Sequence, residues 1–385
     1  MKQIKFKNTE VGMIPEDWES APLSSIGEVK MCKRILKEQT STTGDVPFYK
    51  IGTFGKEPDA FIPRPLYEQF KSLYPYPKKG TILISAAGTI GRTVVFDGKD
   101  AYFQDSNIVW IDHNENKVRN SYLEHYFKVI NWKSENGGTI SRLYNDNLKS
   151  TFLCYPRNKD EQSRIATALS NVDELITTLK KLIEKKRNIK KGAMQELLSG
   201  KSRLSGFTDE WMETKIGSIT GKIPRGQTLT SDEFCFGTIP VMAGGKQYAG
   251  FHNVSNQKGR TITISGSGAS AGFVLLHNTP IFATDCSAIA ESKSFSLDFM
   301  YYLLYYKQDE LYKLQTGGAQ PHVYPRDVEK MEVVVPNDKD EQSAIAQVLT
   351  DMDSEISALE SRLTKYQSLK QGMMQQLLTG KIRLI

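Results

Sequence analysis

The chain has 385 residues and a formal net charge of +6, and 39% of its residues are hydrophobic. That length suits two to four domains rather than one simple core. No run of about 18 apolar residues occurs, so we expect no membrane-spanning helix. Residues 1–7 lack the apolar segment of a secretion signal, which favours a cytoplasmic protein.

The four cysteines, Cys32, Cys154, Cys235 and Cys286, are scattered along the chain, and no two of them form a C-x-x-C pair. This usage argues against a disulfide scaffold and against a zinc site. We therefore predict free, buried thiols and no bound metal.

Two similar units follow one another, with a constant offset of 180 residues between residues 159–204 and 339–384. About half of the positions in these two stretches are identical. Such a repeat has to be identified first, because it decides the fold. Each unit opens on a segment with one tryptophan, Trp18 or Trp211, which we expect to anchor a globular domain.

A polar region rich in Gly, Pro, Tyr and Lys comes next, at residues 30–79 and 221–258, and a β-rich core follows it. The predicted strands and turns correspond between the units: strand-to-loop turns at 47–52 and 240–245, hairpins at 80–96 and 260–276, strands at 107–110 and 287–289, and last strands at 152–156 and 333–336. Aromatic helices are predicted at 122–127 and 299–306, and Gly-Gly loops at 137–144 and 317–324.

Each unit closes on a predicted long helix with clear boundaries. Asn158 stands three residues before Glu161, the spacing of a capping box, and Asp338 precedes Glu341 in the same way. A glycine follows the last apolar residues of each helix, as is typical of a helix C-terminus. These two glycines are Gly200 and Gly380.

Apolar residues recur along both long helices in alternating steps of four and three, which is coiled-coil spacing. Each helix of roughly 40 residues spans about 60 Å. One helix alone cannot bury so narrow a seam, so its expected partner is the other helix, and the order of domains and helices favours an antiparallel pair. The seam residues are Ile165, Leu169, Val172, Ile176, Leu179 and Ile183, and then Ile345, Leu349, Met352, Ile356, Leu359 and Leu363.

The predicted fold class is α/β, of the α+β kind. Two globular domains are expected to be separated by two long antiparallel coiled-coil helices, with a pseudo-two-fold internal repeat. The predicted boundaries are 1–156 for the first domain, 157–204 for the central helix, 205–336 for the second domain and 337–385 for the distal helix.

The glycine-rich stretch 265–272 is similar to a dinucleotide-binding loop, but such a loop opens a helix. Residues 273–276 predict a strand instead, so a hairpin turn is the favoured interpretation. The sequence contains no P-loop, no H-E-x-x-H, no nucleophile elbow and no Asn-Pro-Pro or Asp-Pro-Pro ahead of an aromatic residue. We therefore predict a non-catalytic chain without a cofactor of its own.

Positive charge is concentrated in residues 156–204, where 12 Lys and Arg face 6 Asp and Glu. A solvated, lysine-rich helix face explains this excess as well as a nucleic-acid partner does. Polar and basic side chains in the domain loops are the candidates for contacts with DNA bases and phosphates. They are Lys50, Arg92, Gln104, Ser106, Asn107, Arg142 and Asn145 in the first unit, and Lys246, Ser267, Gln320, His322 and Arg326 in the second.

This arrangement strongly resembles the DNA-specificity subunit of type I restriction–modification systems over essentially the whole chain. The resemblance depends on the duplicated helix starts, Glu161-Gln162 and Glu341-Gln342, and on the closing motifs at 194–201 and 374–381. It implies that each domain is a target-recognition domain for one half of a bipartite, asymmetric site on double-stranded DNA. The helices would set the unspecified gap and dock two methyltransferase subunits.

The resemblance also implies that S-adenosylmethionine, ATP and Mg²⁺ are bound only by partner subunits, which methylate adenine and, as restriction and translocase subunits, cleave DNA. Residues 205–335 carry 11 Lys and Arg against 13 Asp and Glu, so we expect weak DNA binding by the isolated chain. Three alternatives remain open. They are the specificity chain of a fused, type II-like restriction system, a coiled-coil adaptor without nucleic acid, and an enzyme that uses residues 265–272.

Overall fold

The computed structural model describes residues 5–130, 132, 142–229 and 237–385. The chain divides into two compact units, each of which combines one globular domain with a part of each long helix. Unit 1 comprises Met1–Thr178 and Leu363–Ile385, and unit 2 comprises Leu179–Arg362.

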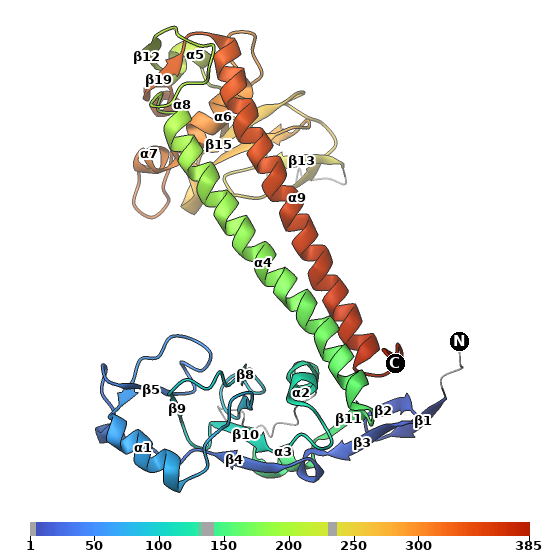
Figure 1. Cartoon of the computed structure of the whole chain (residues 1–385). Helices are drawn as coiled ribbons and strands as arrows, with labels where there is room; N and C mark the ends of the chain where they lie inside the picture. The colour runs from blue at the N-terminus through green and yellow to red at the C-terminus, as the bar shows by residue number, and fades with distance from the viewer. Residues whose placement is uncertain (1–4, 131, 133–141, 230–236) are drawn as a thin grey trace. The chain divides into compact units, whose positions relative to one another are not determined.

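The two long helices, α4 (Lys159–Leu197) and α9 (Lys339–Leu377), are 39 residues each and lie side by side (Figure 1). They are antiparallel within each unit. In unit 1 Lys370 of α9 pairs with Asp173 of α4, and in unit 2 Lys190 of α4 pairs with Asp353 of α9. The prediction of two long antiparallel helices is confirmed.

The domain of unit 1 is built on a four-stranded antiparallel sheet in the order β4-β10-β7-β8, a smaller sheet β6-β5-β9, and the pair β11-β3. Its strands are β1 (Phe6–Thr9), β2 (Gly12–Pro15), β3 (Trp18–Pro22), β4 (Glu28–Met31), β5 (Val46–Tyr49), β6 (Phe61–Ile62), β7 (Ile82–Ser85), β8 (Thr93–Val95), β9 (Tyr102–Phe103), β10 (Ile108–Asp112) and β11 (Phe152–Pro156). Its helices are α1 (Arg64–Leu73), α2 (Asn120–Tyr126) and α3 (Asn145–Ser150), with short 3-10 turns at Leu23–Ser25 and Lys37–Gln39.

Unit 2 repeats this plan with three small sheets, β16-β15-β18, β14-β13-β17 and β12-β19. Its strands are β12 (Trp211–Lys215), β13 (Ile239–Met242), β14 (Gly250–His252), β15 (Thr261–Ser265), β16 (Val274–His277), β17 (Phe282–Ala283), β18 (Cys286–Ala290) and β19 (Glu332–Pro336). Its helices are α5 (Ile216–Thr220), α6 (Leu297–Tyr306), α7 (Gln308–Lys313) and α8 (Pro325–Glu329), and a 3-10 turn covers Gly268–Ser270.

The predicted hairpins are confirmed. Ile84 of β7 pairs with Thr93 of β8, and Ile264 of β15 pairs with Val274 of β16, in antiparallel register. The glycine-rich stretch between β15 and β16 is a hairpin turn, which contradicts the dinucleotide-loop alternative because no helix opens after it.

The long helices take part in the domain cores. In unit 1 the buried side chains of Ile165 and Leu169 join Leu377 in one cluster with α2 and the sheet. In unit 2 the corresponding cluster contains Ile345, Leu349 and Leu197. Each domain is therefore packed on the start of one long helix and the end of the other.

Several elements were not predicted from the sequence. The hairpin β1-β2 precedes Trp18, and both tryptophans begin a strand that pairs with the last strand of their domain, β3 with β11 and β12 with β19. The helix α1 lies within the supposed polar region at 30–79. Pro65 in its first turn was the available signal for a helix start.

The thiols of Cys32, Cys154 and Cys286 are free and buried, as predicted, whereas Cys235 lies outside the described residues. Burial raises the pKa of the Cys32 and Cys286 thiols to about 12, so neither is a reactive thiolate at neutral pH. Residues 137–141 of the first Gly-Gly loop also lie outside the described residues. No helix in the described part of the chain is long and apolar enough to span a membrane.

Candidate functional site

Two buried ion pairs connect the start of each long helix to the tail that follows the other one. Arg383 donates from Nε to Glu161 Oε1 at 2.5 Å and from Nη2 to Oε2 at 2.7 Å. Arg203 holds Glu341 in the same bidentate way at 2.6 and 2.8 Å. The carboxylates of Glu161 and Glu341 are only 2% and 1% exposed, and the two pairs are related by the 180-residue offset. We refer to them as the clasps.

The predicted capping boxes form only in part, because their glutamates belong to the clasps. Asn158 and Asp338 do cap their helices, since each side-chain Oδ1 accepts from the backbone N–H two residues later at 2.8 Å. Glu161 and Glu341 do not return to the cap, because each binds an arginine instead. A charged bidentate pair outcompetes a single neutral backbone donor for a buried carboxylate.

Gln162 and Gln342, which follow the clasp carboxylates, are buried and tie the helix to its domain. Gln162 donates to the carbonyl of Pro156 at 2.7 Å and accepts from the amide of Arg119 at 2.8 Å. Gln342 donates to Pro336 and accepts from the amide of Ser296, both at 3.0 Å. The duplicated Glu-Gln motif therefore holds each long helix to its domain. Its side chains are buried and do not form part of a surface site.

A second equivalent polar cluster holds each domain helix against the long helices. In unit 1 the buried His125 of α2 bonds Ser170 of α4 at 2.9 Å, beside Asp173 and Lys370. In unit 2 Tyr302 of α6 takes the place of the histidine and donates to Asp353 at 2.8 Å. Burial lowers the pKa of His125, with Lys128 adding to the effect, so this histidine is neutral at pH 7.

The predicted seam residues are mostly buried. Ile176, Leu179, Ile183 and Ile356 are 4–8% exposed although none belongs to a domain core, so the neighbouring long helix is the element that covers them. The fully buried members are Ile165, Leu169, Ile345 and Leu349, and the half-buried ones are Val172, Met352, Leu359 and Leu363. Their role in helix pairing and partner binding stays a prediction.

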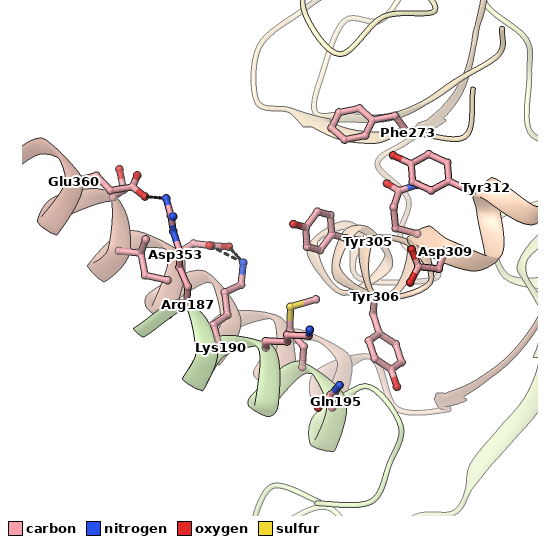
Figure 2. Close-up of a pocket in the computed structure, with 15 residues that line it drawn as sticks. Arg187, Lys190, Gln195, Phe273, Tyr305, Tyr306, Asp309, Tyr312, Asp353 and Glu360 are labelled. Carbon is pink, nitrogen blue, oxygen red and sulfur yellow. Dashed lines mark hydrogen bonds and ion pairs between the residues drawn. The ribbon is translucent and has the colours of Figure 1, made fainter. Parts of the chain in front are cut away.

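A groove adjoins the end of a long helix in each unit. In unit 2 it has a volume of about 1050 Å³ and is bordered by Met194 and Gln195 of α4 and by Tyr305 and Tyr306 of α6. Figure 2 shows these tyrosines across from the ion pairs Arg187–Glu360 and Lys190–Asp353, which join α4 to α9.

The groove of unit 1, about 550 Å³, is bordered by Met374 and Gln375 of α9 and by Tyr126 and Val129 near α2. Met374 and Gln375 correspond to Met194 and Gln195 by the 180-residue offset. The closing motif that the two long helices share therefore lines a groove in both units.

Three of the five candidate DNA-contacting residues of unit 2 lie where three segments meet. The amide of Gly266 donates to the carbonyl of Asp285, and the amide of Val323 donates to the carbonyl of Gly266. These two hydrogen bonds join the β15–β16 turn, the turn before β18 and the end of the second Gly-Gly loop, and we call this meeting point the junction of unit 2. Ser267 and His322 form a bridge across the junction, and Gln320 is exposed beside it.

Unit 1 has the same junction. The amide of Ala86 donates to the carbonyl of Asn107, and that of Leu143 donates to the carbonyl of Ala86. Ser106 and Arg142 are exposed there, and Arg142 forms the bridge to Ala87 that corresponds to the one between His322 and Ser267.

The other candidates have local structural partners or lie apart. Lys50 pairs with Asp59, the guanidinium of Arg92 donates to the carbonyl of Phe54, and the side chain of Gln104 accepts from the amide of Ile51. Three more are placed individually, Asn145 at the start of α3, Lys246 over the ring of Phe273 and Arg326 over the ring of Tyr324. The assignment of these twelve residues to contacts with DNA stays a prediction.

Sequence reasoning missed two arginine–aspartate pairs at the junctions. Arg34 donates from Nε to Asp105 at 2.8 Å, and Arg225 donates from Nη2 to Asp285 at 2.9 Å. The aspartates were visible as the shared residue of two polar turns, at an offset of 180. Their arginine partners are 71 and 60 residues away in sequence, and no local pattern marks them.

Among the described residues no group of three or more His, Cys, Asp or Glu side chains is arranged to hold a metal ion. What the structure presents is two unlike sets of exposed polar loops, each carried by a domain that is clasped to a shared helix pair. These features define a class of protein with two recognition domains on a duplicated helical scaffold.

Comparison with known proteins gives the family. The model of the type I restriction modification DNA specificity domain matches the chain twice, at residues 15–187 and 208–371. The chain belongs to this family of DNA-specificity proteins of type I restriction–modification systems.

Individual relatives agree with this assignment. A protein of Methanocaldococcus jannaschii described as a type I restriction enzyme specificity subunit is 26% identical over 99% of this chain and 97% of its own length. One of Haemophilus influenzae, described likewise, is 53% identical, but the match spans about half of each chain, 46% of both. The crystal structure of a type I S subunit from M. genitalium superposes with a TM-score of 0.67 at 20% identity, covering 97% of this chain and 98% of that one, and it supports the fold.

Proposed function

We propose that this chain is the subunit that selects the DNA target of a type I restriction–modification complex. Each domain recognises one half of a bipartite, asymmetric site, and the helix pair fixes the gap between the halves. Adenine methylation and DNA cleavage belong to partner subunits, which bind S-adenosylmethionine, ATP and Mg²⁺, and the complex works in the cytoplasm.

The observation that carries this proposal is a contrast between two parts of the repeat. The clasps are chemically the same in both units, whereas equivalent junction positions hold different side chains. Arg142 corresponds to His322, and Ala87, its bridge partner, corresponds to Ser267 at the same offset of 180 residues. A repeated scaffold with unlike polar loops is suited to hold two different recognition surfaces, and unlike surfaces require a non-palindromic DNA target.

The paired grooves support two copies of one partner. Because Met194 and Gln195 correspond to Met374 and Gln375, each unit offers a similar lining from a long helix. In the groove of unit 2, Tyr305, which is 43% exposed, provides rigid apolar area of the kind that dominates protein interfaces. We propose that each groove receives one methyltransferase subunit.

A tryptophan placed in a groove is expected to block one partner. Gln195→Trp should reduce the complex from two methyltransferase subunits to one, and Gln195→Trp with Gln375→Trp should remove both. Gln195 and Gln375 are exposed, so the substitutions need not disturb the core. Native mass spectrometry of the co-expressed complex measures the stoichiometry, and Lys180→Trp, at an exposed position of α4 outside both grooves, is the control.

The same samples distinguish DNA recognition from the adaptor alternative. In a gel shift the wild-type complex should bind its site tightly, and the double variant should bind no better than the isolated chain. A complex of full stoichiometry from the double variant contradicts the groove assignment. A wild-type complex that binds no DNA in preference to random sequence contradicts the proposed function and favours an adaptor.

A further inference from the structure

Both junctions contain an arginine that is anchored by a carboxylate and otherwise open to solvent. The Arg34 side chain is 66% exposed and the Arg225 side chain 52% exposed, while Asp105 and Asp285 are 17% and 34% exposed. Within the described part of the chain each guanidinium makes no hydrogen bond other than the one to its aspartate. Most of the N–H donors of both arginines therefore remain available to a ligand.

The backbone at these turns is held in an unusual conformation. Only three described residues other than glycine have positive φ, and two of them are at the junctions, Ser106 at 56° and Asp285 at 43°. Such conformations cost free energy and persist where the surrounding structure imposes them. The hydrogen bonds from Ala86 and Gly266 hold the two turns in place, so the anchoring aspartates are fixed before any ligand binds.

The space around Asp285 is also restricted. A Cβ on Gly266 would lie 2.7 Å from the carbonyl oxygen of Asp285, and one on Gly244 would lie 3.0 Å from its carboxylate. The hydroxyl of Ser267 donates to that same carboxylate, and the amide of Gly226, next to Arg225, is bonded to the carbonyl of Cys286. Arg225 is thus held by its backbone and by its side chain.

Anchoring matters because it selects what the guanidinium can bind. In unit 1 the bond to Asp105 uses Nε, which leaves the two terminal nitrogens of Arg34 free as a parallel pair of donors. In unit 2 the bond to Asp285 uses one N–H of Nη2, so the second N–H of Nη2 and those of Nη1 remain as the corresponding donors of Arg225. That fork matches O6 and N7 of guanine in the major groove, and this pairing is the commonest base-specific contact of arginine. A side chain already oriented by a carboxylate loses less conformational freedom on binding.

We infer that Arg34 and Arg225 determine base specificity, each by recognising a guanine in the half-site of its own unit. The inference rests on the proposed function and adds to it the residue and the base. Asp105 and Asp285 are positioning residues that act through the arginines. Each half of the target therefore contains at least one guanine.

The test uses the complete system in its own cell, with chromosomal variants of this chain and a plasmid library in which the half-site bases are randomised. Methylated adenines are sequenced. Arg34→Lys and Arg34→Ala should both reduce the preference for one guanine in one half-site by about tenfold or more. Arg225→Lys and Arg225→Ala should act only on the other half-site.

Lysine variants separate base recognition from general attraction to phosphate. Arg34→Lys keeps the positive charge but loses the forked pair of donors. If Arg34 contacts a phosphate instead of a guanine, the methylated motif should therefore be the same with Arg34→Lys as with the wild type. Lys33→Ala and Lys222→Ala are matched controls, because both lysines are exposed close neighbours of the two arginines. They should lower methylation evenly across sequences without changing the motif.

A second measurement probes the contact atom by atom. With purified wild-type complex, 7-deazaguanine at the assigned position should weaken binding, because it lacks N7, and the Arg34→Ala complex should not respond to the same replacement. The inference is overturned if a half-site lacks guanine or if the arginine variants keep the wild-type motif. If even the wild-type system methylates the library without any motif that depends on this chain, the proposed function itself fails.

Discussion

Replacing Arg383 by alanine is expected to lower the free energy of unfolding of unit 1 by about 3–5 kcal/mol, the usual cost of leaving one member of a buried ion pair unpaired. Glu161 is 2% exposed and the Arg383 side chain 9% exposed, so water cannot replace the lost partner. Arg383 also stacks over Trp18 and lowers the pKa of Asp17 through hydrogen bonds, and both contacts disappear with it.

Urea denaturation of the full chain measures this effect. Arg64→Ala is the matched control in the same unit, because its partner Asp100 is 43% exposed and such surface pairs contribute at most about 1 kcal/mol. Replacing both clasp residues, with Glu161→Met and Arg383→Met, should recover much of the loss, since no buried charge is left unpaired. A loss below about 1 kcal/mol for Arg383→Ala would mean that the clasp does not hold the tail to the helix.

Lengthening the helix pair is expected to change the distance between the half-sites and leave their bases unchanged. Both α4 and α9 pass from one unit into the other. A heptad inserted into both, between Ile176 and Ile183 and between Ile356 and Leu363, keeps the seam in phase. It adds about 10 Å of helix, which is roughly three base pairs of DNA at about 3.4 Å each.

An insertion of four residues into α4 alone should abolish methylation. Asp173–Lys370 and Lys190–Asp353 lie on either side of the insertion point, and no single register of α9 can satisfy both once α4 is one turn longer. Sequencing methylated adenines in cells that carry each variant distinguishes the two cases. An active double-heptad variant with an unchanged gap would show that the helices do not act as the spacer.

The repeated architecture could be predicted from the sequence because it leaves periodic or duplicated signals. The offset of 180 residues emerges when the sequence is compared with itself, and the steps of four and three in the helices and the alternation in β7 and β15 are local patterns. The clasps could not be predicted, since Glu161 and Arg383 are 222 residues apart. The capping-box spacing even indicated a different partner for Glu161, and that prediction was wrong because a tertiary contact replaced a local one.

The candidate recognition residues were harder to predict for a related physical reason. Ser267 and His322 are polar loop residues that the structure brings together. Lys50 and Arg92, which are polar loop residues of the same kind, bind nearby groups of their own domain. Residue type alone does not reveal which loop side chains already have partners, and it gave no sign of Arg34 or Arg225, whose anchors come from distant segments.

The central claim, that this chain selects the DNA sequence to be modified, is tested most directly by mapping methylated adenines in the native cell with the gene, without it, and with it restored. The account predicts that one bipartite, asymmetric motif is methylated in the first strain, unmethylated in the second and methylated again in the third. The same pattern of methylated adenines in all three strains would contradict it.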